Sequence, residues 1–313
     1  MISSGLLWLA LAMPAAPLAA QEHGEPSHGE GTTAEKVDII TPHITDSHAL
    51  EYPCFSHGGA CHLELPRWAP VHIGGVELDL SPTKHVVMLV LAALLCAVTL
   101  IGAAAAHARH THRVGHPRGF AAGLEAVVLY IRNEVVVPNV GPGGNAFVPF
   151  VLTLFFFILF ANLLGLIPYG STATGNISVT ATLAIITFIV IEIAGMRALG
   201  RHYVGTIIYW PHDMPLYMKL PMTLIMTPVE IISKFTKPFA LAIRLFANMT
   251  AGHIVVLAFI GLIFSFGSWA LAGAPLLMAV GIMVLELFVA FLQAFIFALL
   301  ASVFIGQIRT AHH

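Results

Sequence analysis

Residues 238–253 read PFALAIRLFANMTAGH, and this stretch decides the class of fold. It is apolar apart from a few side chains, one of which is Arg244. An arginine keeps its charge in proteins, so it cannot lower the cost of burial by losing a proton. A permanent charge in an apolar membrane segment is by default a sign of a functional site. We therefore expect Arg244 to face water or a partner carboxylate, and not lipid.

The composition indicates a polytopic membrane protein. Of the 313 residues, 58% are hydrophobic and only 10% are charged, with a mean hydropathy of +0.86. Such values are typical of chains that cross a bilayer several times. The formal net charge of -2 gives no concentrated basic face, so we expect no nucleic-acid partner. No soluble catalytic domain can be placed outside the apolar segments.

Five apolar segments come near or exceed the roughly 20 residues that cross a bilayer as a helix. They cover residues 86–106, 147–167, 177–195, 221–266 and 276–308. The fourth exceeds one perpendicular crossing, so we expect it to be tilted, broken or partly in the membrane plane. An amphipathic stretch between the first two segments, residues 120–137, is expected to be an interfacial helix. The sequence thus predicts an all-α integral membrane protein with about five transmembrane helices.

The residues before the first segment divide into two parts. Residues 1–20 carry a short apolar run that ends in small residues, as in a cleaved signal peptide; an uncleaved interfacial segment is the alternative. Residues 21–82 are polar and rich in Gly, Pro, Glu and His, which predicts an extracytoplasmic extension without a large core. Residues 83–313 then form the polytopic domain.

Basic residues predict the orientation, because cytoplasmic loops carry an excess of Lys and Arg. Those at the ends of the first, third and fifth segments are Arg109, Arg113, Arg118, Arg197, Arg201, Lys219 and Arg309. This distribution places the N-terminus outside and the C-terminus in the cytoplasm. An odd number of crossings, five, satisfies it.

The last two segments carry regularly spaced polar residues. The fourth has Glu230, Lys237, Arg244 and Asn248, and the fifth has Glu286 and Gln293. Spacings of seven or four residues put the members of each set on one helix face, to within roughly 40°. Such a polar stripe lines water, a partner helix or both. His253 is nine residues beyond Arg244, on the opposite side of the helix.

Simpler interpretations of these residues stay open. Arg244 is equally able to form a structural ion pair with Glu230 on the same face. A simple contact between helices would also account for His253 and Glu286. Gln293 can be an interhelical hydrogen-bonding group.

Four further polar residues favour structural interpretations. Lys234 and Lys237 lie near the inner end of their segment and can extend to the interface, which is the preferred interpretation of Lys234. Asn162 and Glu192 are more often packing or helix-end residues. The combination of so many costly polar groups on two consecutive segments nevertheless favours a functional pathway.

Three runs closely resemble a known family. They are IRLFANMTAGH at 243–253, LQAFIF at 292–297 and NLLGLIP at 162–168. Together they resemble subunit a of the bacterial F-type ATP synthase, over about residues 80–310 and in the right order. The resemblance implies a stator beside a ring of c subunits, in which two long, strongly tilted or membrane-plane C-terminal helices form a hairpin against the ring.

The resemblance also implies a mechanism, partners and a location. Two offset half-channels would carry protons to a carboxylate of each c subunit and couple proton flow to rotation. The implied partners are the c-ring, the b subunits of the peripheral stalk, the remaining synthase subunits and lipid, in the bacterial inner membrane. Residues 83–313 would be the proton-channel domain. The coupling ion, proton or sodium, stays open.

Site residues follow from the resemblance in the same way. Arg244 would be the stator arginine, with Asn248 and Gln293 beside the proton path. His253 and Glu286 would be the pair of the outer half-channel, although their types are exchanged relative to the familiar pattern. Glu230 would lie toward the inner half-channel.

No G-x-x-x-x-G-K-[ST] phosphate loop occurs, so we expect no nucleotide site, no catalytic site and no cofactor in this chain. The alternative function is a proton-coupled secondary transporter or metal permease, prompted by the His-rich extension; a structural scaffold is a third. The spacing of Cys54 and Cys61 matches no standard zinc module. We assign no metal site and favour a disulfide between these cysteines.

Overall fold

The computed structural model describes residues 46–54, 59–68, 71–73, 76–78, 81–110, 119–167, 172–208, 215–266 and 269–310. Its long helices are α2 (Lys84–His110), α5 (Val148–Gly165), α6 (Ile177–Leu199), α7 (Leu216–Phe266) and α8 (Trp269–Arg309). The predicted signal peptide and most of the His-rich extension lie outside the described residues. The helices confirm the predicted all-α membrane fold.

Two small antiparallel hairpins precede α2, and the sequence interpretation had not predicted them. Strand β1 (Ala49–Cys54) pairs with β2 (Gly59–Glu64), and β3 (Val71–Ile73) pairs with β4 (Val76–Leu78). The sequence Gly74-Gly75 between β3 and β4 is a two-residue hairpin signal. The interpretation of residues 21–82 rested on composition and did not use it.

The cysteines of the first hairpin are not directly opposite each other. Cys54 pairs with Gly59 and Cys61 pairs with Tyr52 in the backbone register. The structure does not describe the side chains of the two cysteines, so the predicted disulfide stays a prediction.

The predicted interfacial helix is three helical pieces in succession. They are α3 (Phe120–Tyr130), the π-helix η1 (Ile131–Val136) and α4 (Val137–Val140). The last piece ends at Gly141, whose φ of 75° suits glycine and stops the helix. A short 3-10 turn, η2 (Gly144–Phe147), leads into α5.

Local sequence fixes both ends of α6. At its start the Asn176 side chain accepts a hydrogen bond from the Ser178 backbone N–H at 2.9 Å, a common N-cap arrangement. At its end Gly200 takes a φ of 56°. The flanking 3-10 turns are η3 (Ala173–Gly175) and η4 (Gly200–Thr206).

Five helical stretches are long and apolar enough to cross a membrane, among the described residues. They are Lys84–Gly102, Gly144–Gly165, Ile177–Thr206, Tyr217–Ile263 and Gly273–Arg309, close to the five predicted segments. At 1.5 Å per residue, the 51 residues of α7 extend about 76 Å and the 41 of α8 about 62 Å, against a hydrocarbon layer of about 30 Å. Both helices are therefore longer than one perpendicular crossing requires.

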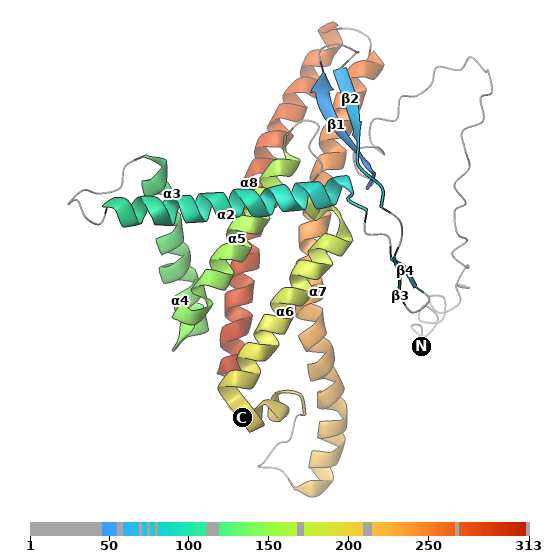
Figure 1. Cartoon of the computed structure of the whole chain (residues 1–313). Helices are drawn as coiled ribbons and strands as arrows, with labels where there is room; N and C mark the ends of the chain where they lie inside the picture. Colours follow the sequence, from blue (N-terminus) through green and yellow to red (C-terminus); the bar gives the residue numbers. More distant parts are fainter. Residues whose placement is uncertain are drawn as a thin grey trace, which may run out of the picture. The chain divides into compact units, whose positions relative to one another are not determined.

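Helices α7 and α8 lie side by side as a hairpin, and α2 runs across α5 (Figure 1). The predicted possibility that the fourth segment is broken is wrong. Helix α7 continues through Pro221, Pro228 and Pro238, although each lacks a backbone N–H donor.

Small residues let α8 pack closely against its neighbours. Four alanines, none of them exposed, recur along one face of α8: Ala290, Ala294, Ala298 and Ala301. Helices in lipid associate by close van der Waals packing, which small side chains permit. Gly306 permits another close approach, to α4, because a Cβ there would collide with the Asn139 carbonyl oxygen.

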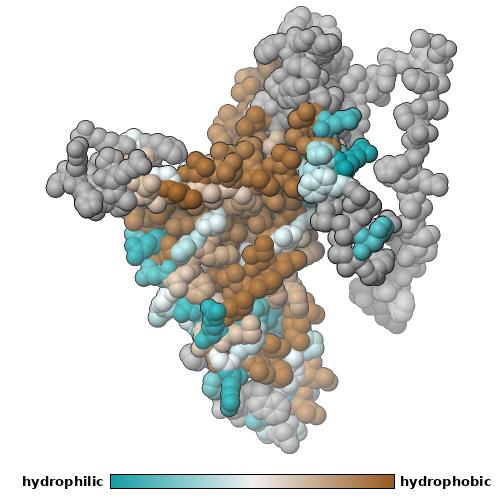
Figure 2. Space-filling model, in the orientation of Figure 1, coloured by the Kyte–Doolittle hydropathy of each residue, from teal (hydrophilic) through white to brown (hydrophobic). Residues whose placement is uncertain are grey.

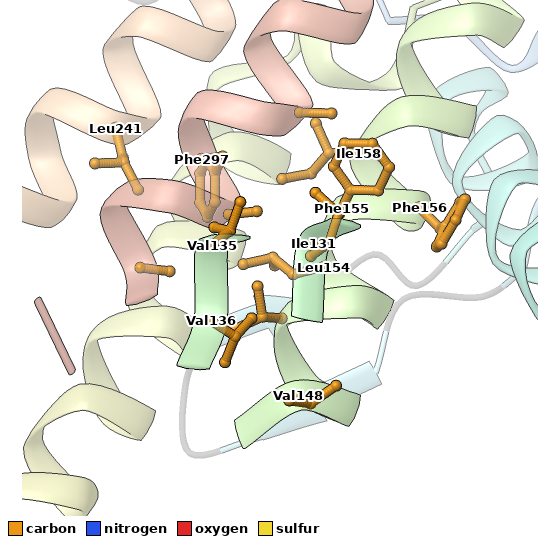
Figure 3. Close-up of a cluster of buried hydrophobic side chains, with 14 of the residues drawn as sticks. Ile131, Val135, Val136, Val148, Leu154, Phe155, Phe156, Ile158, Leu241 and Phe297 are labelled. Carbon is orange, nitrogen blue, oxygen red and sulfur yellow. The ribbon is translucent and has the colours of Figure 1, made fainter. Parts of the chain in front are cut away.

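Large apolar side chains fill the space beside this alanine face. Figure 3 shows side chains of η1, α5 and α8 gathered into one cluster, among them Ile131, Phe155 and Phe297. All three are at most 1% exposed. The face drawn in Figure 2 is largely apolar, as expected of a surface that lies against lipid. The cluster fixes α8, which carries half of the candidate site.

Candidate functional site

The last turns of α6 and α8 meet the first half of α7. A Cβ added to Gly195 would lie 2.7 Å from the Ile308 side chain, so the last turns of α6 and α8 touch. The Lys237 ammonium lies 3.5 Å from the Gln307 amide oxygen, which brings the first half of α7 to the same end. Arg197 and Arg309 lie in the last turns of α6 and α8, so basic residues gather there.

The turn between α5 and α6 lies against the other half of the α7–α8 hairpin. Asn162 is fully buried; its amide donates to the Ala290 carbonyl of α8 at 3.3 Å and accepts from the Thr174 hydroxyl at 2.7 Å. The Thr250 hydroxyl of α7 donates to the Gly175 carbonyl at 3.5 Å. These contacts tie the turn to the second half of α7.

The first polar group of the site, named here the Glu286 region, comprises Asn248, Gly252, His253, Glu286 and Gln293. The Asn248 amide donates to the Gln293 side-chain oxygen at 3.0 Å. Gln293 is 2% exposed and Asn248 is exposed, so this bond connects the interior of the hairpin with its open face.

Glu286 lies against the backbone of Gly252 and is only 6% exposed. A Cβ added to Gly252 would lie 2.8 Å from both Cγ and Cδ of the Glu286 side chain. Glycine at this position therefore makes room for the carboxylate. The predicted pair of His253 and Glu286 has its members on neighbouring turns of the two helices, and the pairing itself stays a prediction.

The second polar group, named here the Lys234 region, comprises Glu192, Glu230, Lys234, Lys237 and Gln307. The Lys234 ammonium lies 3.4 Å from the Glu192 carboxylate, and both side chains are largely buried. It also donates to the Thr206 hydroxyl at 3.1 Å and to the Tyr203 hydroxyl at 3.4 Å. The partners of the Lys234 ammonium thus come from α6 and from η4, and its extension to the membrane interface stays a prediction.

All five residues of the Lys234 region line one cavity of about 160 Å³ between α6, α7 and α8. Charged and amide groups that share a cavity attract water. The predicted pathway residue Glu230 therefore lies among ionisable neighbours, next to Glu192, which sequence had assigned to packing. The only sequence signal for the pair of Lys234 and Glu192 was the presence of a charged residue in each of two separate apolar segments.

Arg244 lies between the two regions, on the exposed face of α7. Along the helix it is seven residues from Lys237 and eight from Gly252, or about 10 and 12 Å. It lines an open groove of about 500 Å³ that also includes Lys237 and Ser233. Lys237 lines both the groove and the cavity of the Lys234 region, so the two spaces adjoin.

The alternative in which Glu230 is the structural partner of Arg244 is wrong. The two residues share a helix face but are 14 residues apart, which is about 21 Å along the axis and beyond the reach of both side chains. Within the described part of the chain Arg244 forms no ion pair. The guanidinium thus lies on an exposed face of the chain, in an open groove.

Asn162→Ala is expected to destabilise the isolated subunit by about 1–3 kcal/mol, because it leaves the buried Thr174 hydroxyl and Ala290 carbonyl without this partner. The thermal unfolding midpoint in detergent measures the effect. The control is Thr182→Ala, since the exposed Thr182 hydroxyl bonds only within its own helix. Equal midpoints for the two variants would contradict the prediction.

These features define a class of protein: a multi-pass membrane protein in which two long helices carry two separate polar regions with an outward arginine between them. Residues 85–306 match the family described as ATP synthase A chain. The chain belongs to this family.

Similar proteins cover nearly the whole chain. ATP synthase subunit a of Anaeromyxobacter dehalogenans (strain 2CP-C) is 44% identical over 94% of this chain and 76% of its own length. The same subunit of Chloroherpeton thalassium is 41% identical over 96% of this chain and 89% of its own. That of Myxococcus xanthus is 42% identical over 88% and 91%. The resemblance inferred from the three sequence runs is confirmed.

Proposed function

We propose that this chain is the proton-translocating stator subunit of an F-type ATP synthase, and that its two polar regions are the two proton half-channels. The observation that carries the proposal is the position of Arg244, which lies between the regions and faces outward. Membership of the family favours this function over a secondary transporter, a metal permease or a scaffold.

The proposed partner of the outward face is a ring of c subunits. The groove that Arg244 lines also exposes the large apolar side chains of Val229 and Ile232, as suits a helix-covered contact within the membrane. A carboxylate carried past Arg244 by the ring would be held ionised by the guanidinium. Having given up its proton on one side, it accepts one only after it has moved into the other half-channel.

In the proposed path, a proton from outside enters through His253 and Glu286 in the Glu286 region. Asn248 and Gln293 order water beside the ring without adding charge. After rotation, the proton leaves through the Lys234 region past Glu230. Arg244 obstructs direct passage between the regions, so protons travel with the ring.

The proposed orientation has the N-terminus outside and the C-terminus in the cytoplasm of a bacterium, with the protein in the inner membrane. The positive-inside rule supports it, since Arg197 and Arg309 lie at the end that contains the Lys234 region. We further propose residues 1–20 as a signal peptide, 21–82 as the external extension and 83–313 as the proton-channel domain. The b subunits of the peripheral stalk are proposed partners, and nucleotide chemistry is assigned to other subunits.

Inverted membrane vesicles from cells that depend on this chain are expected to acidify inside when ATP is added. Deletion of the chain should abolish the acidification, and expression of the full-length chain from a plasmid should restore it. The decisive control is ATP hydrolysis by the detached catalytic part, which deletion should leave unchanged. Undiminished ATP-driven acidification without the chain would reject the proposed function.

A further inference from the structure

The Lys234–Glu192 ion pair joins two membrane helices at a site where a purely apolar contact would suffice. Its side chains are 13% and 16% exposed, and the two oppositely charged groups are 3.4 Å apart. A largely buried pair pays a desolvation cost that its attraction often only balances, so stability alone is a weak reason for it. Its position beside a polar cavity suggests a different purpose.

The Lys234–Glu192 pair lines the same cavity as Glu230, and Lys234 is close to Glu230 along the chain. Lys234 follows Glu230 by four residues, which places the two on neighbouring turns of one face of α7. Both line the cavity that also contains Glu192. Lys234 is therefore a cation that pairs with one carboxylate and follows another by about one helical turn.

The cavity and the ion pair have further polar neighbours, one of which, Lys237, is a second cation. Lys237, also from α7, interacts with Gln307 and lies over the Phe304 ring at 5.1 Å. Helix α8 contributes the neutral Gln307 amide, and η4 contributes the Tyr203 and Thr206 hydroxyls, which bond to Lys234.

We propose that the Lys234–Glu192 pair is a positioning element of the inner half-channel, which sets the local charge at Glu230 and thereby the pH range in which this half-channel exchanges protons. The inference rests on the proposed function. Neither residue of the pair needs to carry the translocated proton. Lys234 adds a positive charge to the cavity, and Glu192 partly cancels it.

This arrangement predicts opposite effects for the two single substitutions. Lys234→Met removes a cation from the cavity, so protons enter it more readily at high pH and the alkaline limb of ATP-driven pumping moves to higher pH. Glu192→Gln leaves the cation uncompensated, so the same limb moves to lower pH. The expected shifts are about 0.1–0.4 pH unit, from the strength of helix pairs four residues apart. The double variant should return close to the wild-type profile.

The experiment measures ATP-driven acidification of inverted vesicles against the pH of the medium, which contacts the cytoplasmic side. Intact complexes carry wild type, each single substitution, the double substitution or Lys219→Met. The last is a matched control, since Lys219 is on the same helix about 22 Å along the axis from Lys234. It should leave the profile unchanged.

Opposite shifts for the single variants, cancelled in the double variant, would support the positioning role, because mere loosening of the α6–α7 contact would not move the profile in two directions. Shifts in the same direction, or none, would overturn it. If Lys234→Met does not assemble, Glu192→Gln and the double variant decide: an acid shift that the double variant does not reverse would overturn the inference. Arg244→Ala tests the proposed function separately, so unshifted profiles together with lost pumping in Arg244→Ala would reject only the ion pair's role.

Discussion

Arg244→Ala is expected to reduce ATP-driven proton pumping between about tenfold and a thousandfold, the range by which an opposite charge within a few ångströms alters the ionisation of a carboxylate. The side chain is exposed in the single chain and, within the described residues, forms no ion pair. Its removal should therefore leave the subunit folded and the complex assembled. Pumping is lost because the passing carboxylate keeps its proton and no fixed cation separates the two half-channels.

The same variant should raise the passive proton leak across the vesicle membrane, since protons can then pass between the Glu286 and Lys234 regions. Ser233→Ala is the matched control, because Ser233 lines the same groove but is uncharged. Acidification by ATP and its decay after ATP is consumed report pumping and leak in one trace. Wild-type pumping by an assembled Arg244→Ala complex would reject the stator role of this arginine.

Gly252→Ala is expected to lower pumping by about tenfold or more, the effect of the roughly 1–3 kcal/mol that overpacking costs. The added Cβ would lie within 2.8 Å of the Glu286 side chain, which must then leave its place. If Glu286 belongs to the outer half-channel, a displacement of its carboxylate interrupts the proton path.

The control for this substitution is Gly281→Ala, which meets nothing within 4 Å and lies on α8. ATP-driven acidification and the amount of assembled complex are measured for both variants. Equal pumping by the two would show that the close approach of Gly252 to Glu286 has no part in proton transfer. A Gly252→Ala complex that fails to assemble would make the glycine a folding requirement instead.

Much of the fold could be predicted because a bilayer limits the choice of structure. Each apolar run of sufficient length must be a helix, since unpaired backbone groups are costly in lipid. The five runs therefore give five helices, and the excess length of residues 221–266 is found in the 51-residue helix α7. The strong tilt of this helix in the membrane stays a prediction. The hairpins β1–β2 and β3–β4 could not be predicted in this way, because they lie outside the apolar runs and depend on short local turns.

The candidate site could be predicted only along each helix, and not across helices. Helical periodicity put Glu230 and Arg244 on one face, which made an ion pair between them conceivable. The axial rise puts them about 21 Å apart, which is too far for such a pair. The contact between Lys234 and Glu192 depends on how α6 packs on α7. No periodicity within one segment contains that information.

The location of Asn162 shows the same limit. Its polar amide in an apolar run had a structural interpretation, and the structure gives it bonds to Thr174 and Ala290. Those bonds position the part of α8 that carries Glu286 and Gln293. Asn162, which sequence had assigned to packing, thus supports the site by holding α8 in place.

The central claim is that the two polar regions open to opposite sides of the membrane, and cysteine accessibility tests it most directly. In a chain whose three native cysteines are replaced, His253→Cys and Gln307→Cys are each treated with a membrane-impermeant thiol reagent, in right-side-out and in inverted vesicles. Ile186→Cys, from the exposed apolar surface of α6, is the control for unreactive positions next to lipid. We predict that His253→Cys reacts only in right-side-out vesicles and Gln307→Cys only in inverted ones. Reaction of both from the same side would contradict the two half-channels.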